Sequence, residues 1–381
     1  MKRKVVLHVT GGMNRGGAES LIMNLFRKID REKINFHFLS LADKKADYDD
    51  EILALGGEIF YITPMRFRHP WSFFLSLLSF FSKKKRYYDA IHVHTLFNIG
   101  IVLLLSRIAK IPLKIAHSHS TRDTLKDSIV RIYYQKIMRF LIFKNSTILL
   151  ACSKEAGVYL FGEKNARKAK VVPNAINIGD YSTRNIEMIY KLKKELNINE
   201  NYTIIGQVGN IKPVKNHLFS LKVAEKLLET GMNFRMLFIG GITENKKESL
   251  ELNISELGLS KYVTILGLRE DIPQLLNTLD IFIMPSIYEG LPVALIEAQA
   301  AKLPCIVSNT ITTESDIGLN LVNFIGINKE KDIDKWVDKI LQLSKMTVDI
   351  NDRQLERIFS ESGFDMAKSI SIYMNLYMHG K

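Results

Sequence analysis

The sequence predicts an α/β protein of two domains, each built on a parallel sheet with helices on both faces. Strand-like apolar runs alternate with longer segments of helical periodicity almost throughout the chain, and this alternation is typical of parallel sheets. The length of 381 residues, 46% of them hydrophobic, exceeds what a single core usually supports. Residues 178–188 are polar and lack clear periodicity, so we place the domain boundary there.

The strand-like runs form two consecutive series. The first series covers residues 5–9, 34–40, 58–63, 90–95, 114–119, 146–153 and 170–174. The second covers residues 202–209, 234–241, 262–267, 281–285 and 304–309. We therefore expect one domain over residues 1–180 and another over residues 181–359. The last stretch, Ser360 to Leu376, is amphipathic and is predicted to be helical.

Composition argues against an exported protein. Cys152 and Cys305 lie far apart in strand-like segments, so we interpret them as buried thiols of a cytosolic protein and not as a disulfide or a metal site. The basic start of the chain is followed by an apolar run of only five residues before Gly11, which is too short for a signal-peptide core. We expect a cytoplasmic location.

The positive charge is concentrated in the amino-terminal half. Residues 1–180 contain 30 Lys and Arg against 15 Asp and Glu, an excess of +15, whereas the whole chain carries +13. Arg66, Arg68 and the run Lys83 to Arg86 flank the apolar segment 71–81. Those 11 residues are too few to cross a bilayer. A basic amphipathic segment suits an anionic membrane surface; an ordinary core helix with a solvated basic end is the alternative.

Nucleic acid is a third partner that a basic face could bind. The sequence contains no helix-turn-helix, zinc-finger or aromatic RNA-binding pattern that would support it. We expect no nucleic-acid partner.

Two carboxylates, Glu289 and Glu297, lie eight residues apart around a predicted strand-to-helix turn. The turn contains Gly290, and Pro292 marks the helix start. A helix N-terminus at the carboxyl end of a strand can hold a phosphate or a nucleotide, and neighbouring carboxylates can accept hydrogen bonds from sugar hydroxyls. The alternative is a pair of solvated glutamates, one in a loop and one on a helix.

The whole string around these residues, PS-x-x-EGLP-x-x-x-x-EAQA from Pro285 to Ala300, resembles the Glu-x7-Glu signature of family 4 glycosyltransferases. The form is that of bacterial capsular and exopolysaccharide enzymes, which are retaining and have the GT-B fold. The resemblance implies two facing Rossmann-like domains, with a last helix, about 360–381, that crosses back onto the first. It also implies that Glu289 lies by the transferred sugar, that Glu297 binds the ribose, and that Gly290, Leu291 and Pro292 contact the donor.

A glycine-rich turn follows the first strand. Gly11, Gly12, Gly16 and Gly17 precede a helix expected to begin near Ala18, and glycines allow backbone N–H groups to approach a phosphate closely. The G-x-G-x-x-G spacing of dinucleotide sites is absent, and a plain connection is the alternative. The turn resembles the family's amino-terminal glycine loop, which implies that Gly16 and Gly17 face the donor diphosphate.

The second domain opens with the segment 207–217. Family members usually have Gly-Arg followed five residues later by Lys here, and these cations neutralise the donor phosphates. The resemblance assigns the lysine to Lys215 and places Asn210 where arginine is usual, so one charge is missing. Lys215 could instead be a solvated residue near a helix start. Arg269 resembles a residue that contacts the base or ribose.

Four histidines lie at strand ends of the first domain: His92 and His94, His117 and His119. Each could be a hydrogen-bonded structural residue. The i, i+2 pairs point to one strand face and could indicate a metal, but no nearby acid or cysteine completes a ligand set, so no metal is predicted. His119 matches the family histidine near the transferred sugar, which implies that it polarises a donor hydroxyl or orients the sugar.

The sequence thus predicts a retaining, metal-independent hexosyltransferase without a cofactor. It would move a sugar from a nucleotide donor, expected to be a UDP-sugar, to a glycan or lipid-linked glycan acceptor in surface polysaccharide biosynthesis, on the inner face of the membrane. Two alternatives remain. One is a GT-B-like sugar-nucleotide epimerase or phosphorylase, and the other is a non-catalytic, membrane-docked scaffold.

Overall fold

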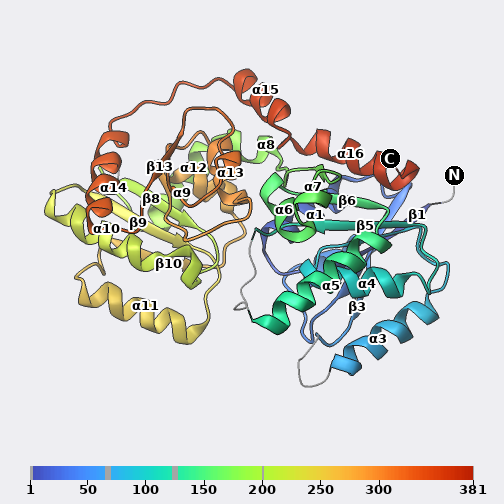
Figure 1. Cartoon of the computed structure of the whole chain (residues 1–381). Helices are drawn as coiled ribbons and strands as arrows, with labels where there is room; N and C mark the ends of the chain where they lie inside the picture. The colour runs from blue at the N-terminus through green and yellow to red at the C-terminus, as the bar shows by residue number, and fades with distance from the viewer. Residues whose placement is uncertain (1–2, 65–69, 122–127, 200, 381) are drawn as a thin grey trace. The chain divides into compact units, whose positions relative to one another are not determined.

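The computed structural model describes residues 3–64, 70–121, 128–199 and 201–380, and its chain forms two compact units (Figure 1). Unit 1 contains Met1–Ile176 and Gly363–Lys381, and unit 2 contains Asn177–Ser362. The sequence placed the first boundary after residue 180, four residues beyond the end of the first segment of unit 1. Arg66 and Arg68 lie outside the described residues.

Unit 1 is a seven-stranded sheet with helices on both faces. Its strands are β1 (Lys4–Thr10), β2 (Ile34–Ser40), β3 (Glu58–Tyr61), β4 (Ala90–Val93), β5 (Leu113–Ser118), β6 (Ile148–Ala151) and β7 (Lys170–Val171). Its helices are α1 (Gly17–Lys28), α2 (Asp49–Ala54), α3 (Pro70–Lys83), the 3-10 turn η1 (Leu96–Asn98), α4 (Ile99–Ser106), α5 (Ile129–Asn145), α6 (Lys154–Phe161), α7 (Glu163–Ala166) and α16 (Met366–His379).

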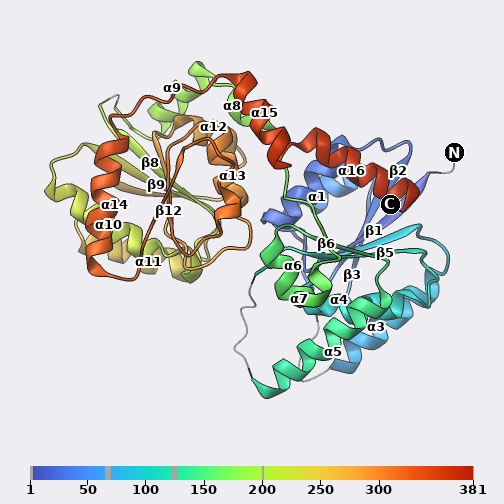
Figure 2. The ribbon, with the colours of Figure 1, turned by 45° about the horizontal axis from the view of Figure 1, so that its top comes forward.

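Side chains along the parallel strands of unit 1 alternate between the two faces of the sheet and form a hydrophobic core on each face. Val6 on β1 joins Phe26, Phe36 and Tyr373 under α1 and α16, while Leu7 and its neighbours pack under α3, α4 and α5 on the opposite face. Figure 2 shows α1 and α16 on one face of the sheet and α3, α4 and α5 on the other. The strand period of two therefore sends consecutive β1 residues into different cores.

Unit 2 is a six-stranded parallel sheet. Its strands are β8 (Thr203–Val208), β9 (Phe234–Ile239), β10 (Val263–Gly267), β11 (Ile281–Met284), β12 (Cys305–Ser308) and β13 (Val322–Ile325). Its helices are α8 (Ile178–Ser182), α9 (Ile186–Glu195), the turn η2 (Pro213–Lys215), α10 (His217–Glu229), α11 (Glu244–Glu256), α12 (Ile272–Thr278), α13 (Val293–Ala300), the turn η3 (Thr313–Ser315), α14 (Glu330–Leu343) and α15 (Asp352–Ser362). The short strand β13, whose residues are all partly exposed, is absent from the strands expected from the sequence.

Both sheets reverse their strand order at one internal strand. The orders are β3-β2-β1-β4-β5-β6-β7 and β10-β9-β8-β11-β12-β13. The strands that directly follow β1 and β8 in sequence lie on one side of them, and the later strands, from β4 and β11 on, lie on the other side. The loops that follow strands on either side of such a reversal diverge and leave room for a ligand. The loops after β8 and β11, and those after β1 and β4, are therefore where sites are expected.

The carboxyl end of the chain departs from the single helix expected over Ser360 to Leu376. Two helices occur instead, α15 and α16, separated at Gly363. Gly363 has φ of 83°, a left-handed conformation that favours glycine and ends a helix. Asp365 then caps α16 by accepting from the backbone N–H of Ala367 and Lys368.

Glycine is required where the ends of β8 and β9 meet. Gly240 has φ of 154°, and a Cβ added there would lie 2.2 Å from the carbonyl oxygen of Gly209. We predict that Gly240→Ala lowers the melting temperature by about 5 °C or more, because backbone would have to move. Gly179→Ala is the control, since an added Cβ there meets nothing within 4 Å. Equal melting temperatures for the two variants in a thermal scan would contradict the prediction.

Candidate active site

An ion pair joins the two loops at the strand reversal of unit 2. The Nζ of Lys215, after β8, lies 2.7 Å from Oε1 of Glu289, after β11, and the two side chains are only 19% and 14% exposed. Little water reaches the pair, so each charge stabilises the other more than it would at the surface. The structure thus brings together two residues that the sequence selected separately.

The local sequence around Lys215 explains its placement. Gln207 at the end of β8 donates a hydrogen bond to the backbone oxygen of Lys215 (2.7 Å) and accepts one from the Ser220 hydroxyl of α10 (2.7 Å). Gly209 leaves room for the lysine, because a Cβ there would lie 3.1 Å from its Cε. Asn216 is left-handed, with φ of 55°, and turns the chain from η2 into α10. Lys215 is therefore held before α10 and is not a solvated residue.

The loop that carries Glu289 is held from two sides. The N–H of Ile287 donates to the carbonyl oxygen of Val214 at 2.8 Å, which ties this loop to η2. The carbonyl oxygen of Ser286 accepts from the hydroxyls of Ser308, the last residue of β12 (2.6 Å), and of Thr310 (3.0 Å). The loop then passes through Gly290 and the buried Leu291 and Pro292 to α13, with Pro292 as its N-cap.

Glu297 projects from α13 and has a partner that the sequence did not reveal. The Tyr181 hydroxyl of α8 donates to its Oε1 at 2.8 Å. The Nδ2 of Asn277 in turn donates to the backbone oxygen of Tyr181. Burial raises the pKa of Glu297, and the hydrogen bond from Tyr181 opposes that rise. Tyr181 thus orients the carboxylate and favours its ionised form.

Asn210 connects two strand ends. Its Oδ1 accepts from the backbone N–H of Gly241 at 3.0 Å, and the N–H of Ile211 donates to the carbonyl oxygen of Gly241 at 2.8 Å. Arginine has no acceptor and could not receive the first bond. The departure from the usual arginine therefore coincides with a local structural role for the amide.

Arg269 is held by acidic neighbours. Its guanidinium makes a two-pronged contact with Asp271, at 2.8 and 2.7 Å, and its Nη1 lies 2.9 Å from Glu195. Hydrogen bonds to Asp271 and then Glu195 raise the pKa of Arg269 above its ordinary value. The expected contact of Arg269 with a base or ribose stays a prediction.

The glycine turn of unit 1 leads directly into α1. The helix begins at Gly17, one residue before the expected Ala18, with Gly16 as its N-cap. The N–H of Arg15 donates to Asp47 at 3.0 Å, which anchors the turn. A Cβ on Gly16 would lie 2.5 Å from Oε2 of Glu19, so glycine there makes room for the carboxylate of the first helical turn.

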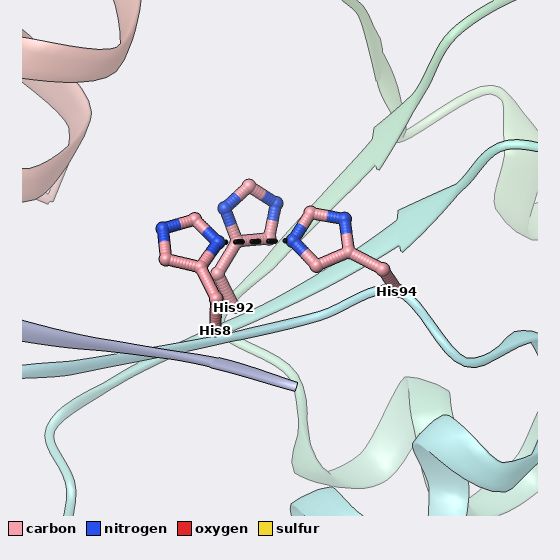
Figure 3. Close-up of side chains that lie close together, drawn as sticks. All are labelled: His8, His92 and His94. Atoms are coloured by element: carbon pink, nitrogen blue, oxygen red, sulfur yellow. Dashed lines mark hydrogen bonds between the residues drawn. The ribbon is translucent and has the colours of Figure 1, made fainter. Parts of the chain in front are cut away.

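Five histidines meet at the strand reversal of unit 1, one more than the sequence analysis considered. They are His8 of β1, His92 and His94 at β4, and His117 and His119 at β5. His8 Nδ1 lies 3.2 Å from His94 Nε2, and His94 Nδ1 lies 2.9 Å from His119 Nε2. Figure 3 shows the rings of His8, His92 and His94 close together, with the hydrogen bond from His8 to His94.

A second chain of hydrogen bonds crosses the same group. His92 Nε2 lies 3.0 Å from His117 Nδ1, and His92 Nδ1 lies 2.8 Å from the Tyr377 hydroxyl of α16. Burial lowers the pKa of His8 to about 3 and that of His119 to about 4, where Asn174 acts in the opposite sense. The imidazoles are therefore neutral at pH 7, with one ring hydrogen each.

Two groups of three histidines could hold a metal ion. The ring nitrogens of His8, His92 and His94, and those of His94, His117 and His119, lie within 4.8 Å of one another. The metal-free site is predicted because no acid or cysteine near the four histidines completes a ligand set, and His8 is a further candidate ligand that the pattern did not reveal. Neutral imidazoles are common ligands of metals such as zinc, although nitrogens in these groups also take part in the hydrogen bonds above. The metal-free site stays a prediction.

Family models match the chain in two consecutive segments. The model described as Glycosyltransferase Family 4 matches residues 15–180, and the one described as Glycosyl transferases group 1 matches residues 189–361. The chain is 35% identical to the putative glycosyltransferase EpsF of Bacillus subtilis, over 98% of this chain and 96% of that protein. It is 33% identical to the capsular polysaccharide biosynthesis glycosyltransferase CapH of Staphylococcus aureus, over 82% and 83%. The resemblance seen in the sequence is confirmed.

More distant relatives and solved structures agree. An Escherichia coli UDP-Gal:alpha-D-GlcNAc-diphosphoundecaprenol alpha-1,3-galactosyltransferase is 26% identical over 80% of this chain and 79% of its own. A glycosyltransferase structure from Rickettsia africae has a TM-score of 0.77 at 18% identity, over 99% and 98% of the two chains. Anabaena HepE, in complex with UDP and glucose, has a TM-score of 0.75 at 17% identity, over 98% and 99%. The GT-B fold expected from the sequence is confirmed.

The raised pKa of Glu297 predicts a pH-dependent stability. An acid with a raised folded pKa destabilises the fold while it is ionised, and the penalty is relieved as pH falls through that pKa. We predict that Glu297→Gln, which keeps the acceptor for Tyr181, raises the melting temperature at pH 8 by about 1–3 °C. The difference should shrink towards pH 5. A difference that stays constant or grows as the pH is lowered would contradict this.

The histidine chain predicts one tautomer. The two end nitrogens, Nε2 of His8 and Nδ1 of His119, are both buried without a hydrogen-bond partner among the described residues. Asn174 acts on His119 in the direction that raises its pKa, so a ring hydrogen costs less at that end than an unpaired N–H at His8 Nε2. The hydrogens of His8, His94 and His119 should therefore all reside on Nδ1. Nitrogen chemical shifts of ¹⁵N-histidine-labelled protein test this, with His379, which is exposed, as a reference. An Nε2–H signal for His119 would contradict the prediction, because the hydrogen bonds would then run from His119 to His94 to His8.

Proposed function

The chain belongs to family 4 of the glycosyltransferases, and we propose that it moves a sugar from a nucleotide donor to a membrane-linked glycan acceptor, with retention of anomeric configuration. The observation that carries the proposal is the Lys215–Glu289 pair at the strand reversal of unit 2, with Glu297 on the helix that follows. A cation and two carboxylates at this position suit a donor with a diphosphate and two sugars.

Lys215 is the proposed partner of the donor diphosphate. Its ammonium is largely buried and held by the strand end, so a phosphate oxygen there would meet a fixed positive charge. N–H groups at the start of α13, after Gly290 and Leu291, would add to it. An incoming diphosphate competes with Glu289 for the ammonium, which frees the carboxylate to face the sugar. The UDP and UDP-glucose complexes of Anabaena HepE support a UDP-sugar.

Glu297 is the proposed ligand of the ribose hydroxyls. A carboxylate accepts from two neighbouring hydroxyls, and Tyr181 fixes its orientation through one oxygen. Asn210 would act at the donor by keeping the strand ends together, and Arg269 by shaping the loop after β10. In unit 1, Gly16 and Gly17 are proposed to present backbone N–H groups to the diphosphate.

The proposed chemistry rests on charge stabilisation. Cleavage of the donor leaves negative charge on the diphosphate, which Lys215 and the start of α13 would stabilise. Glu289 and His119 are the proposed catalytic residues beside the transferred sugar. His119 would be neutral there, because burial lowers its pKa to about 4. With lysine and helix N–H groups in this role, transfer should need no divalent ion.

The acceptor is proposed to be a glycan on a membrane lipid, made for a surface polysaccharide. The name of CapH ties that relative to capsular polysaccharide, and the E. coli relative is named for a diphosphoundecaprenol substrate. The excess of 30 basic over 15 acidic residues in positions 1–180 suits an acceptor that carries phosphate.

Transfer from a panel of labelled nucleotide sugars into a membrane-lipid extract, with and without EDTA, tests the proposal. We expect incorporation from one donor that survives EDTA and falls about 100-fold or more in Glu289→Gln and in Lys215→Gln. Lys226→Gln is the control, since Lys226 also has an acidic partner, Glu229 at 2.6 Å, but on the exposed side of α10. NMR of the product should show the donor's anomeric configuration.

Three results would overturn parts of the proposal. Loss of transfer with EDTA, restored by a divalent ion, would assign a metal to the reaction. An inverted product would rule out retention. Full activity of both Glu289→Gln and Lys215→Gln would place the chemistry elsewhere.

A further inference from the structure

Helix α5 exposes an unusually apolar surface. Seven of its large apolar side chains are between 44% and 75% exposed: Ile129, Val130, Ile132, Tyr133, Ile137, Phe140 and Phe143. Val130, Tyr133, Ile137 and Phe140 follow one another at intervals of three or four residues, so they form a continuous stripe on one side of the helix. A stripe of this size on a water-facing helix indicates a contact that the isolated chain does not make.

The opposite side of α5 accounts for its packing in unit 1. Its buried residues are Met138, Ile142 and Asn145. Gly100 of α4 lets the two helices approach closely, because a Cβ there would lie 2.9 Å from the carbonyl oxygen of Met138. The core therefore uses the α4 side of α5 and leaves the stripe uncovered.

The charges of α5 have one sign. The helix contains Arg131, Lys136, Arg139 and Lys144 and no acidic residue. Arg139 is turned inward and donates to the backbone oxygens of Tyr159 and Leu160. Lys136 and Lys144 are exposed, so they can accompany an outward-facing surface.

Lysines accompany the exposed aromatic rings. The Nζ of Lys136 lies 5.7 Å from the ring centre of Tyr133, and that of Lys144 lies 5.7 Å from that of Phe140. Lys168, which follows α7, adds a third cation 4.8 Å from the ring centre of Phe143. Each ammonium thus lies close to an aromatic ring, so a ring that enters an apolar layer would have a cation near the polar boundary of that layer.

We propose that this α5 surface, formed by Ile129, Val130, Tyr133, Ile137, Phe140 and Phe143 with Lys136, Lys144 and Lys168, docks on an anionic lipid bilayer. Apolar rings would enter the boundary between headgroups and acyl chains, and the lysines would meet lipid phosphates. Among the described residues, no helix is long and apolar enough to cross a membrane, so α5 would lie along the surface.

Charge distinguishes the bilayer from a second copy of the chain. Two copies paired through the same surface would place like cations against one another without an acidic residue of α5 between them. An anionic lipid surface is complementary to the same cations. The bilayer is therefore the occupant that the charges favour.

The structure also distinguishes α5 from the segment that the sequence singled out for membrane contact. Phe73, Leu77 and Phe81 of α3 are buried in the core of unit 1. Among its described residues, the exposed large apolar side chains of α3 are Trp71 and Leu75, at 74% and 59%. The apolar face of α3 therefore packs as in an ordinary core helix, and α5 offers the larger exposed apolar surface.

Co-sedimentation with phosphatidylcholine vesicles, with and without phosphatidylglycerol, tests the proposal without donor or acceptor. The full chain should bind the anionic vesicles, and raised salt should weaken binding. The variant Tyr133→Ser/Ile137→Ser/Phe140→Ser should lose about 100-fold or more in partitioning. Lys136→Gln/Lys144→Gln/Lys168→Gln should lose about 100-fold, since each lysine near an anionic surface contributes roughly a factor of five. Trp71→Ser/Leu75→Ser on α3 is the matched control and should bind normally.

Thermal melts establish that each variant is folded. If the serine variant does not fold, the lysine variant alone tests the docking surface. Equal partitioning of the wild type and both α5 variants, or an equal loss in the α3 control, would overturn the proposal. So would a wild-type dimer that dissociates in the serine variant, because the occupant would then be a second copy. The docking surface and the proposed function share one expectation, that the acceptor is linked to a membrane, and the inference rests on the proposed function in that respect alone. Vesicle binding with no transfer would contradict that function alone, and transfer without vesicle binding would contradict the docking surface alone.

Discussion

The ion pair between Lys215 and Glu289 is the interaction on which the candidate site of unit 2 depends. Each charge is largely removed from water and lies against the other, so removing either one takes away a stabilising charge from the one that remains. The loops that carry them are held by a backbone hydrogen bond between Ile287 and Val214 and by hydrogen bonds from the hydroxyls of Ser308 and Thr310. A fixed cation and a fixed carboxylate on two adjoining loops provide charges that are already in place before a ligand arrives.

Sequence patterns were sufficient for the architecture and for the motif residues. Apolar runs of strand length located twelve of the strands, and the string around Glu289 and Glu297 indicated the family. Contacts between residues far apart in the sequence could not be predicted from these local patterns. Tyr181 meets Glu297 across 116 residues, and His8 meets His94 across 86. Those pairings follow from strand order and helix placement, and no local periodicity records them.

The errors have local physical causes. The strand β13, Val322–Ile325, has only four residues and Asn323 interrupts its apolar run, so neither alternation nor a continuous apolar run marks it. The helix expected over Ser360 to Leu376 contained Gly363, whose left-handed conformation divides it. A glycine inside a helical pattern is tolerated in some helices and ends others, and only the packing on either side decides between them.

The place of α16 in unit 1 has a consequence for biosynthesis. Met366, Tyr373 and Tyr377 belong to the same core as Val6 and Phe36, and the Tyr377 hydroxyl bonds to His92. The ribosome must therefore make all of unit 2 before the first unit can complete its interior. At about 5–20 residues per second, the intervening segment takes roughly 10–40 s to translate. During that interval the nascent amino-terminal half has an open apolar face, which makes it a substrate for chaperones that bind emerging chains.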